Sequence, residues 1–515
     1  MRIFTLTGEF VMSQKSSPPF ARMAAGVVAG ALVLAVGHLF AAVINPAASP
    51  FFAVGSTIID LTPKPVKDAI IERFGTNDKL VLFISLALGV AAMGALAGVL
   101  ERRKYWGSAV FIVGGAVVAS AALTRPNAQW WFAIPAIAGV AAGIAALRVL
   151  TRTHDRTPET TDRRRFLALL GGLTAVAGGI FVGAQYLAQR LRDVAADRGK
   201  FLLPAVGSKG RPITAAVSLP ESGITPFVTK NGDFYRIDTA LQIPSMPQAE
   251  WQLRIHGMVE QELVLTFDDL RRRAAVERTI TLTCVSNFVG GNLAGNATWT
   301  GYLLKDLLAE ARPLRDADMV LSRSADGWTA GTPIGALTDG RDSLLAVGMN
   351  GEPLPLEHGY PARLIVPGLY GYVSATKWVV DLEVTRFDRA SGYWTDRGWS
   401  ENGPIKTASR IDVPAPFAVL EPGEVVVAGV AWAQHRGVAR VEVQVDDGPW
   451  RDAELAEAYS NDTWRQWRTV WAATPGNHTL RVRAVDSAGE TQTGDRAEPF
   501  PNGATGWHSK VVTIR

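Results

Sequence analysis

The chain has 515 residues, of which 48% are hydrophobic, and its 52 basic and 48 acidic side chains leave a net charge of +4. So small a positive excess predicts no nucleic-acid partner, because phosphate backbones are bound by clustered cations. The single cysteine excludes an internal disulfide and an iron–sulfur cluster held by cysteines.

Hydrophobic residues concentrate before about residue 190. Five apolar runs rich in Ala, Gly, Val and Leu come near the roughly 20 residues that a membrane-spanning helix requires. They cover residues 21–44, 80–100, 107–123, 130–150 and 166–187. We predict a transmembrane bundle over residues 21–190, after a disordered N-terminus of residues 1–20 that holds a second candidate start at Met12. A transporter is disfavoured because no charges pair at membrane depth.

Basic loops orient these helices. Residues 101–104 and the arginine-rich stretch 148–165 are expected in the cytoplasm by the positive-inside rule, whereas the first loop, 45–79, has mixed charges. The odd number of spans then places everything after residue 190 outside the cytoplasm. Residues 163–165, three arginines before the fifth run, also resemble a twin-arginine export signal. Ordinary positive-inside flanking explains them equally well.

The remainder of the chain predicts two soluble domains. Residues 200–410 indicate an α+β domain, with a strand at 251–257 and helices at 266–273 and 303–311. A Pro-rich join at 411–416 follows. Residues 416–515 predict an immunoglobulin-like β-sandwich, whose expected job is interaction or dimerisation. Its predicted strands are 425–432, 438–445, 464–471 and 478–484.

Cys284, the lone cysteine, ends a β-branched run at 279–283. The thiol has three plausible uses: a small buried hydrophobe, a nucleophile, or a single soft ligand to a metal. Ser286, Asn287 and two glycines follow it, and such residues let a backbone approach a ligand closely. A strand end that opens into a polar loop is a common place for a site.

Three stretches carry a family resemblance: residues 281–287, residues 357–368 and the continuation to Lys377. They resemble the molybdopterin-binding domain of the sulfite oxidase family, and the similarity covers roughly residues 200–515. The resemblance implies a molybdenum held by a pyranopterin dithiolene, with Cys284 as metal ligand and catalytic residue. It also implies that a set of cofactor-binding residues lies around the pterin and its phosphate: Phe234, Tyr235, Arg236, Asp326, His358, Arg363, Ser374, Thr376 and Lys377.

The chain departs from sulfite oxidases where they bind their substrate. The family places an arginine a few residues after the cysteine, but residues 289–291 here are Val-Gly-Gly. Only Arg236 keeps a matching place, and it is our candidate for contact with an anionic substrate. Candidates for the family's active-site tyrosine are Tyr393, Trp394, Arg397 and Trp399. A neutral or weakly charged oxo-acceptor, such as a sulfoxide, therefore fits at least as well as sulfite.

The resemblance implies two-electron oxygen-atom transfer on a small molecule, so electrons must pass to or from a partner. The sequence has no haem-attachment motif, and His38 is the sole histidine in any predicted helix. We therefore expect a separate cytochrome or quinone-linked protein, and a homodimer formed through the sandwich. The alternative is a non-catalytic, membrane-anchored binding protein in which Cys284 is structural.

The predicted topology is tested with reporter fusions. A reporter that is active only outside the cytoplasm is expected to work when fused after residue 200 and to fail when fused at residue 156. The reverse pattern would show that the spans are miscounted. If the arginines at 163–165 are an export signal, replacing all three by lysine leaves the first four spans inserted but keeps the soluble domains inside.

Overall fold

The computed structural model describes residues 19–515 apart from residues 64–65, 67–68, 71–72, 75–76, 102–104, 126–127, 156–159 and 192. The predicted disordered N-terminus up to residue 18, the second start at Met12 and most of the basic loop at 101–104 lie outside the described residues. The chain divides into two compact units, Met1–Leu191 and Arg192–Arg515.

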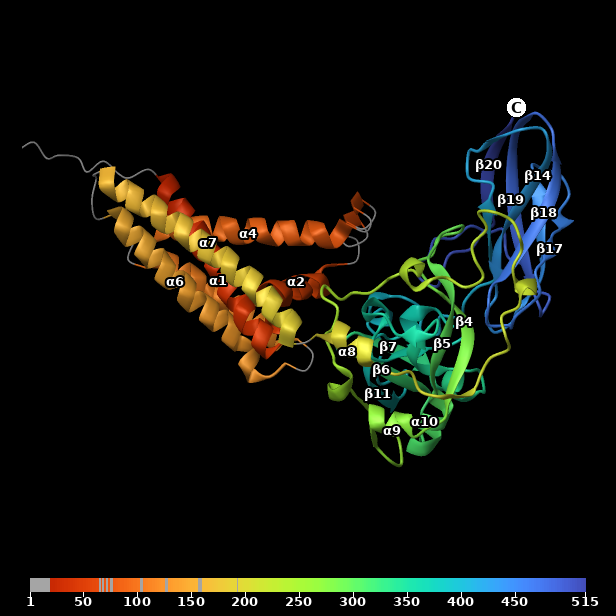
Figure 1. The fold of residues 1–515 in the computed structure, drawn as a ribbon, viewed down its shortest axis with the longest axis horizontal. Helices are drawn as coiled ribbons and strands as arrows, with labels where there is room; N and C mark the ends of the chain where they lie inside the picture. The colour runs from red at the N-terminus through yellow and green to blue at the C-terminus, as the bar shows by residue number, and fades with distance from the viewer. Residues whose placement is uncertain are drawn as a thin grey trace, which may run out of the picture. The chain divides into compact units, whose positions relative to one another are not determined.

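The first unit contains five helices that are long and apolar enough to cross a membrane, by length and composition. They are α1 Pro19–Ile44, α4 Asp78–Leu100, α5 Trp106–Leu123, α6 Ile134–Asp155 and α7 Thr160–Leu191. Four of the five predicted apolar runs fall wholly within them, and the run 130–150 begins in the 3-10 turn η3 Trp130–Ala133, which leads into α6. Figure 1 shows α1, α6 and α7 lying alongside one another. A further short apolar helix, α2 Pro50–Leu61, lies in the predicted first loop and was not expected.

Glycines allow the helices of this unit to approach closely. A Cβ added at Gly26 of α1 would lie 1.9 Å from the carbonyl oxygen of Gly94 in α4. His38 of α1 is buried, and its Nδ1 lies 3.1 Å from the Ser49 hydroxyl. The packing is therefore built from small residues in contact, the usual means of helix association in lipid.

The second unit begins with helix α8 Val194–Lys200. Before residue 408 it contains one six-stranded sheet and one five-stranded sheet. The first sheet holds β1 Val206–Ser208, β4 Ala275–Thr283, β5 Ala294–Leu303, β8 Leu344–Met349, β9 Glu352–Pro353 and β10 Arg363–Ile365. The second holds β2 Gln252–Gly257, β3 Leu263–Thr266, β6 Met319–Ser324, β7 Thr329–Pro333 and β11 Val379–Thr385. The predicted strand at 251–257 is thus confirmed.

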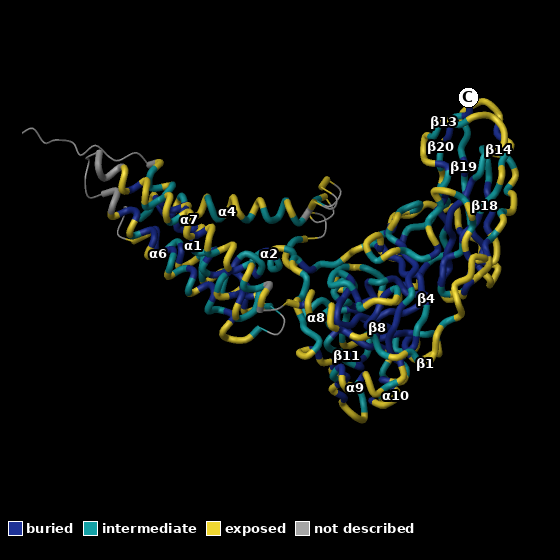
Figure 2. The backbone as a smooth tube through the Cα atoms, viewed as in Figure 1, coloured by how far each residue is buried: buried dark blue, intermediate teal, exposed yellow. Residues whose placement is uncertain are grey.

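Short helices complete this domain. They are α9 Phe267–Arg271, α10 Leu304–Ala311 and α11 Ile334–Thr338. The first two confirm the predicted helices, whereas α8 and α11 were not predicted. The domain is mostly β with a few short helices, whereas the sequence predicts an α+β domain. Figure 2 shows its most buried backbone around β4 and β8.

Residues from 408 onward form two sheets packed on one apolar core. One sheet holds β12 Ala408–Val413, β14 Gly423–Trp432, β17 Glu454–Leu455 and β18 Arg465–Ala473. The other holds β13 Val419–Leu420, β15 Val438–Val445, β16 Arg451–Asp452, β19 Gly476–Asp486 and β20 His508–Ile514. The four predicted strands are present. The Pro-rich join overlaps β12, because Ile411 pairs with Gly429 of β14.

The sandwich is hydrogen-bonded to β4, the strand that leads to Cys284. The side-chain amide of Gln434 donates to Thr283 Oγ1 at 2.9 Å. The backbone N–H of Trp464 donates to Thr281 Oγ1 at 2.8 Å, and that hydroxyl donates in turn to Asn296 Oδ1 at 2.9 Å. The end of β4 is therefore fixed by both domains.

Thr281→Val tests the hydrogen bonds that the Thr281 hydroxyl forms with Trp464 and Asn296. Valine keeps the shape of threonine but leaves a buried N–H and a buried amide oxygen without their partner, which costs about 1–3 kcal/mol. We expect the melting temperature of the full chain in detergent to fall by a few degrees. Thr338→Val, which removes a hydroxyl from an exposed position on α11, is the matched control. An equal effect of the two variants would show that the hydrogen bonds of Thr281 do not stabilise the protein.

Candidate functional site

Cys284 begins a loop, residues 284–293, whose two ends are hydrogen-bonded to each other. Its backbone N–H donates to the Leu293 carbonyl at 2.9 Å, and its own carbonyl accepts from the Asn287 N–H at 3.1 Å. The Asn287 side chain accepts from the Leu293 N–H at 2.9 Å. Burial raises the pKa of the Cys284 thiol, and hydrogen bonds from Ser286 oppose this shift. The thiol is thus held at a fixed point, in its neutral form, by a rigid loop.

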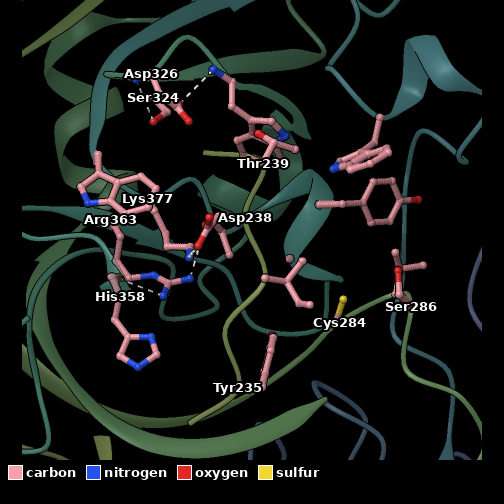
Figure 3. A pocket seen from close by; sticks show the side chains of 18 of the residues that line it. Tyr235, Asp238, Thr239, Cys284, Ser286, Ser324, Asp326, His358, Arg363 and Lys377 are labelled. Carbon is pink, nitrogen blue, oxygen red and sulfur yellow. Dashed lines mark hydrogen bonds and ion pairs between the residues drawn. The ribbon is translucent and has the colours of Figure 1, made fainter. Parts of the chain in front are cut away.

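The thiol faces a cavity that is partly open to solvent. Its wall combines the loop after Cys284, the segment at 234–239, the β6–β7 turn and the segment from His358 to Trp378. Figure 3 shows Cys284 and Ser286 on one side of this pocket, and His358, Arg363 and Lys377 on the other. The two sides therefore differ in chemistry.

Arg363 is a buried cation held by backbone oxygens. Its guanidinium donates to the carbonyls of His358 at 3.1 Å, Ala375 at 3.3 Å and Leu364 at 3.4 Å. It also lies 5.2 Å from the centroid of the Trp299 ring. Burial lowers its pKa to about 10, so it stays charged at neutral pH. Within the described part of the chain no carboxylate forms an ion pair with it, so the charge awaits an anion.

Lys377 lies beside Arg363 and has a carboxylate partner. Its Nζ donates to Asp238 Oδ2 at 2.9 Å and to the Glu357 carbonyl at 3.1 Å. Burial lowers the pKa of Lys377 to about 8, against the opposing effect of Asp238. Arg236 donates to the same Asp238 oxygen at 2.9 Å from outside the cavity wall.

His358 contributes a neutral ring. Its Nε2–H donates to the Asn231 carbonyl at 3.0 Å, and burial with the nearby Arg363 charge lowers its pKa to about 4. Gly359 follows at φ +110°, and a Cβ there would lie 3.0 Å from Arg363 Cβ and 3.2 Å from Lys377 Cα. Only glycine suits this turn, which draws the histidine, arginine and lysine together.

Seven of the ten sequence-predicted residues line the cavity: Phe234, Tyr235, Cys284, Asp326, His358, Arg363 and Lys377. Arg236, Ser374 and Thr376 do not. The Ser374 hydroxyl donates to the Tyr370 carbonyl at 2.9 Å, and the Thr376 hydroxyl lies 2.7 Å from that of Ser322, so both are engaged within the protein. The Arg236 guanidinium turns away from the wall because it pairs with Asp238.

Sequence reasoning missed several cavity residues, among them Asp238, Thr239, Trp328, Tyr372 and Trp378. The available signal for Asp238 was its place two residues after Arg236. Of the four candidates for an active-site tyrosine, Trp394 and Trp399 line the cavity. Tyr393 instead lies under Arg397, whose guanidinium carbon is 3.5 Å from the ring centroid.

The donor set limits which metal could be held here. In the ranges that the structure describes, no group of three or more His, Cys, Asp or Glu side chains is placed to bind a metal ion. A metal bound to Cys284 must therefore bring most of its ligands with it. The uncompensated Arg363 at the other side of the cavity suits an anionic group on such a ligand. The residues present thus fit a soft metal carried by a phosphorylated organic ligand.

A family model described as Oxidoreductase molybdopterin binding domain matches residues 240–394. Mitochondrial sulfite oxidase of Rattus norvegicus is 31% identical over 354 residues, 58% of this chain and 62% of that protein. The chain therefore spans under two thirds of this curated relative. An uncharacterized oxidoreductase, YuiH of Bacillus subtilis (strain 168), is 31% identical over 154 residues, 30% of this chain and 74% of that protein.

Among solved structures, the sulfane dehydrogenase SoxCD from Paracoccus pantotrophus matches with a TM-score of 0.49 at 25% identity. The match covers 59% of this chain and 86% of that one.

Burial of the thiol predicts slow alkylation. In protein prepared without metal or cofactor, Cys284 is expected to react slowly with iodoacetamide at pH 7, and about tenfold faster for each pH unit until the raised pKa is passed, because the thiolate is the nucleophile. Ser286→Ala removes a hydrogen bond that favours the thiolate, so it slows labelling further. Since the chain has one cysteine, incorporated label reports on this thiol alone. Fast labelling independent of pH would contradict the burial.

Proposed function

The chain belongs to the sulfite oxidase family of molybdopterin-dependent oxidoreductases, and we propose that it is a membrane-anchored enzyme transferring oxygen atoms to or from a small molecule. One observation carries this proposal: a lone thiol and an uncompensated buried guanidinium face the same cavity. A cofactor with a soft metal at one end and a phosphate at the other satisfies both groups.

Within this proposal each residue has a task. Cys284 is the protein ligand to the metal, and it must lose its proton to bind. Arg363 and Lys377 hold the phosphate, while Phe234, Tyr235, Asp326 and His358 line the pterin. Ser374 and Thr376 act indirectly, by fixing the backbone that leads to Lys377. When bound, the molybdenum supplies the two-electron oxygen-atom transfer, a chemistry that protein side chains lack.

The substrate proposed is neutral or weakly charged, as a sulfoxide is. Val285 and Ser286, which follow the thiol in sequence, line the cavity together with Tyr372, Trp394 and Trp399, and none of these residues is a cation. Among the described residues Arg363 is the one arginine in the wall, and backbone carbonyls hold it with the pterin site. A doubly charged oxyanion is normally held by paired hydrogen bonds from arginines.

The setting of the enzyme is also proposed. The basic loops favour a catalytic unit on the extracytoplasmic side of the cell membrane, anchored by the five apolar helices. A cytochrome or a quinone-linked protein exchanges electrons with it. The C-terminal sandwich, whose two sheets share one core as in immunoglobulin-like domains, is the proposed surface for a homodimer.

Cys284→Ser is expected to abolish turnover and leave the fold intact. Serine is nearly isosteric, but its oxygen is a harder ligand and matches a soft metal poorly. Activity, molybdenum content and melting temperature should be measured on the same preparation of full chain. Wild-type turnover by the serine variant would end the assignment of this thiol as the metal ligand.

Steady-state kinetics decides the substrate class. With an artificial electron carrier, the purified full chain is expected to turn over sulfoxides better than sulfite, and Arg236→Ala is expected to weaken whatever anion contact remains. Sulfite oxidation at the roughly 10⁴ to 10⁸ M⁻¹s⁻¹ typical of evolved enzymes would contradict the proposal. Molybdenum and pterin analysis of the same samples separates a wrong substrate from a missing cofactor.

A further inference from the structure

Asp238 occupies an unusual position between two cations. One of its oxygens, Oδ2, accepts from Lys377 Nζ at 2.9 Å and from Arg236 Nε at 2.9 Å. The exposed fractions of the side chains are 6% for Asp238, 11% for Lys377 and 43% for Arg236. The carboxylate thus bridges a buried cation and one that reaches solvent.

The two cations of the cavity wall differ in their partners. Lys377 is neutralised by Asp238, whereas Arg363 is held by backbone carbonyls. Both face the same cavity, together with Asp238 itself. A phosphate placed between the two cations would therefore meet a carboxylate already bound to one of them.

Burial makes this competition consequential. A lysine ammonium removed from water is destabilised, and a nearby anion offsets part of that cost, so Asp238 stabilises Lys377 while no ligand is present. A phosphate carries more charge than a carboxylate and accepts several charge-assisted hydrogen bonds at once. It can therefore replace Asp238 at Lys377 and also satisfy Arg363.

We propose that Asp238 is a positioning residue, an internal counter-ion that holds Lys377 in the empty site and yields it to the phosphate of the incoming cofactor. This inference rests on the proposed function, since it takes the phosphate to bind at Lys377 and Arg363. Arg236 keeps the displaced carboxylate paired, because it donates to the same oxygen from the solvent side. No buried charge is then left without a counter-ion.

A second carboxylate in the wall does not repeat this role. Asp326 accepts from the Trp328 N–H at 3.2 Å, and the ion pair that Lys377 forms among the described residues is with Asp238. Burial raises the pKa of Asp326, which favours its neutral form and reduces its repulsion of a phosphate. Asp238 is therefore the carboxylate that competes with the ligand.

The test uses the cofactor-free full chain in detergent, with inorganic phosphate as the probe. Asp238→Asn is expected to lower the melting temperature without phosphate, and to bind phosphate about tenfold more tightly than the wild type, because its competitor is gone. Asp233→Asn, at an exposed position in the same segment, is the matched control and should change neither value. Lys377→Met should weaken phosphate binding and remove the difference between Asp and Asn at position 238.

Arg236→Ala provides an opposite prediction in a variant altered at a half-exposed side chain. Without Arg236 the carboxylate loses one of the two cations that share its Oδ2 and binds Lys377 more tightly, so phosphate should bind several-fold more weakly than in the wild type. This variant keeps the proposal testable if Asp238→Asn does not fold. A purely structural role for Asp238 would lower stability but would not raise phosphate affinity.

Different results would disprove the counter-ion role of Asp238 and the proposed phosphate site. If Lys377→Met weakens phosphate binding but Asp238→Asn binds it no better than the wild type, the counter-ion role is wrong and the phosphate site stands. If Arg236→Ala binds phosphate as tightly as the wild type, the counter-ion role is likewise contradicted. If phosphate binds none of the proteins, both this inference and the proposed phosphate site are overturned.

Discussion

The burial of Arg363 without a carboxylate is the constraint around which the site is organised. A guanidinium removed from water costs free energy unless its hydrogen bonds and charge are met. Backbone carbonyls of His358, Leu364 and Ala375 meet the hydrogen bonds but leave the charge. The turn at Gly359 and the strand β10 thus hold a buried cation whose charge has no carboxylate partner among the described residues.

The thiol depends on a different part of the chain. Cys284 ends β4, and the sandwich reaches that strand through Gln434 and Trp464. Arg410 of β12 also donates to the Gly291 carbonyl at 2.8 Å, so the loop after the thiol is tied to the same domain. The sandwich adds no residue to the cavity wall described here, yet it sets the position of the thiol. The position of the thiol therefore depends on the sandwich as well as on the first domain.

Much of this arrangement is predictable from sequence, because local composition determines it. Five apolar runs become five long helices, and β-branched alternation gives strands such as β2 and β15. The family resemblance predicts that His358, Arg363 and Lys377 share a site, and the three residues line one cavity. The rest depends on tertiary contacts that no local pattern records. Asp238 and the inward hydroxyls of Ser374 and Thr376 belong to this second class, as does the overlap of β12 with the Pro-rich join.

The separation of charge within the cavity has a consequence for substrate binding. Arg363 and Lys377 lie on the opposite side of the cavity from the thiol, and Tyr372, Trp394 and Trp399 also line the cavity. The rings of Tyr372 and Trp399 lie 5.8 Å apart, and those of Trp394 and Trp399 6.3 Å apart, so they form one continuous apolar surface. Aromatic surface of this kind gains free energy by burying apolar groups rather than by neutralising charge. This surface supports the proposal of a substrate that carries a neutral oxo group on a hydrocarbon body, because a small hydrated dianion would lose its water there without a cation in return.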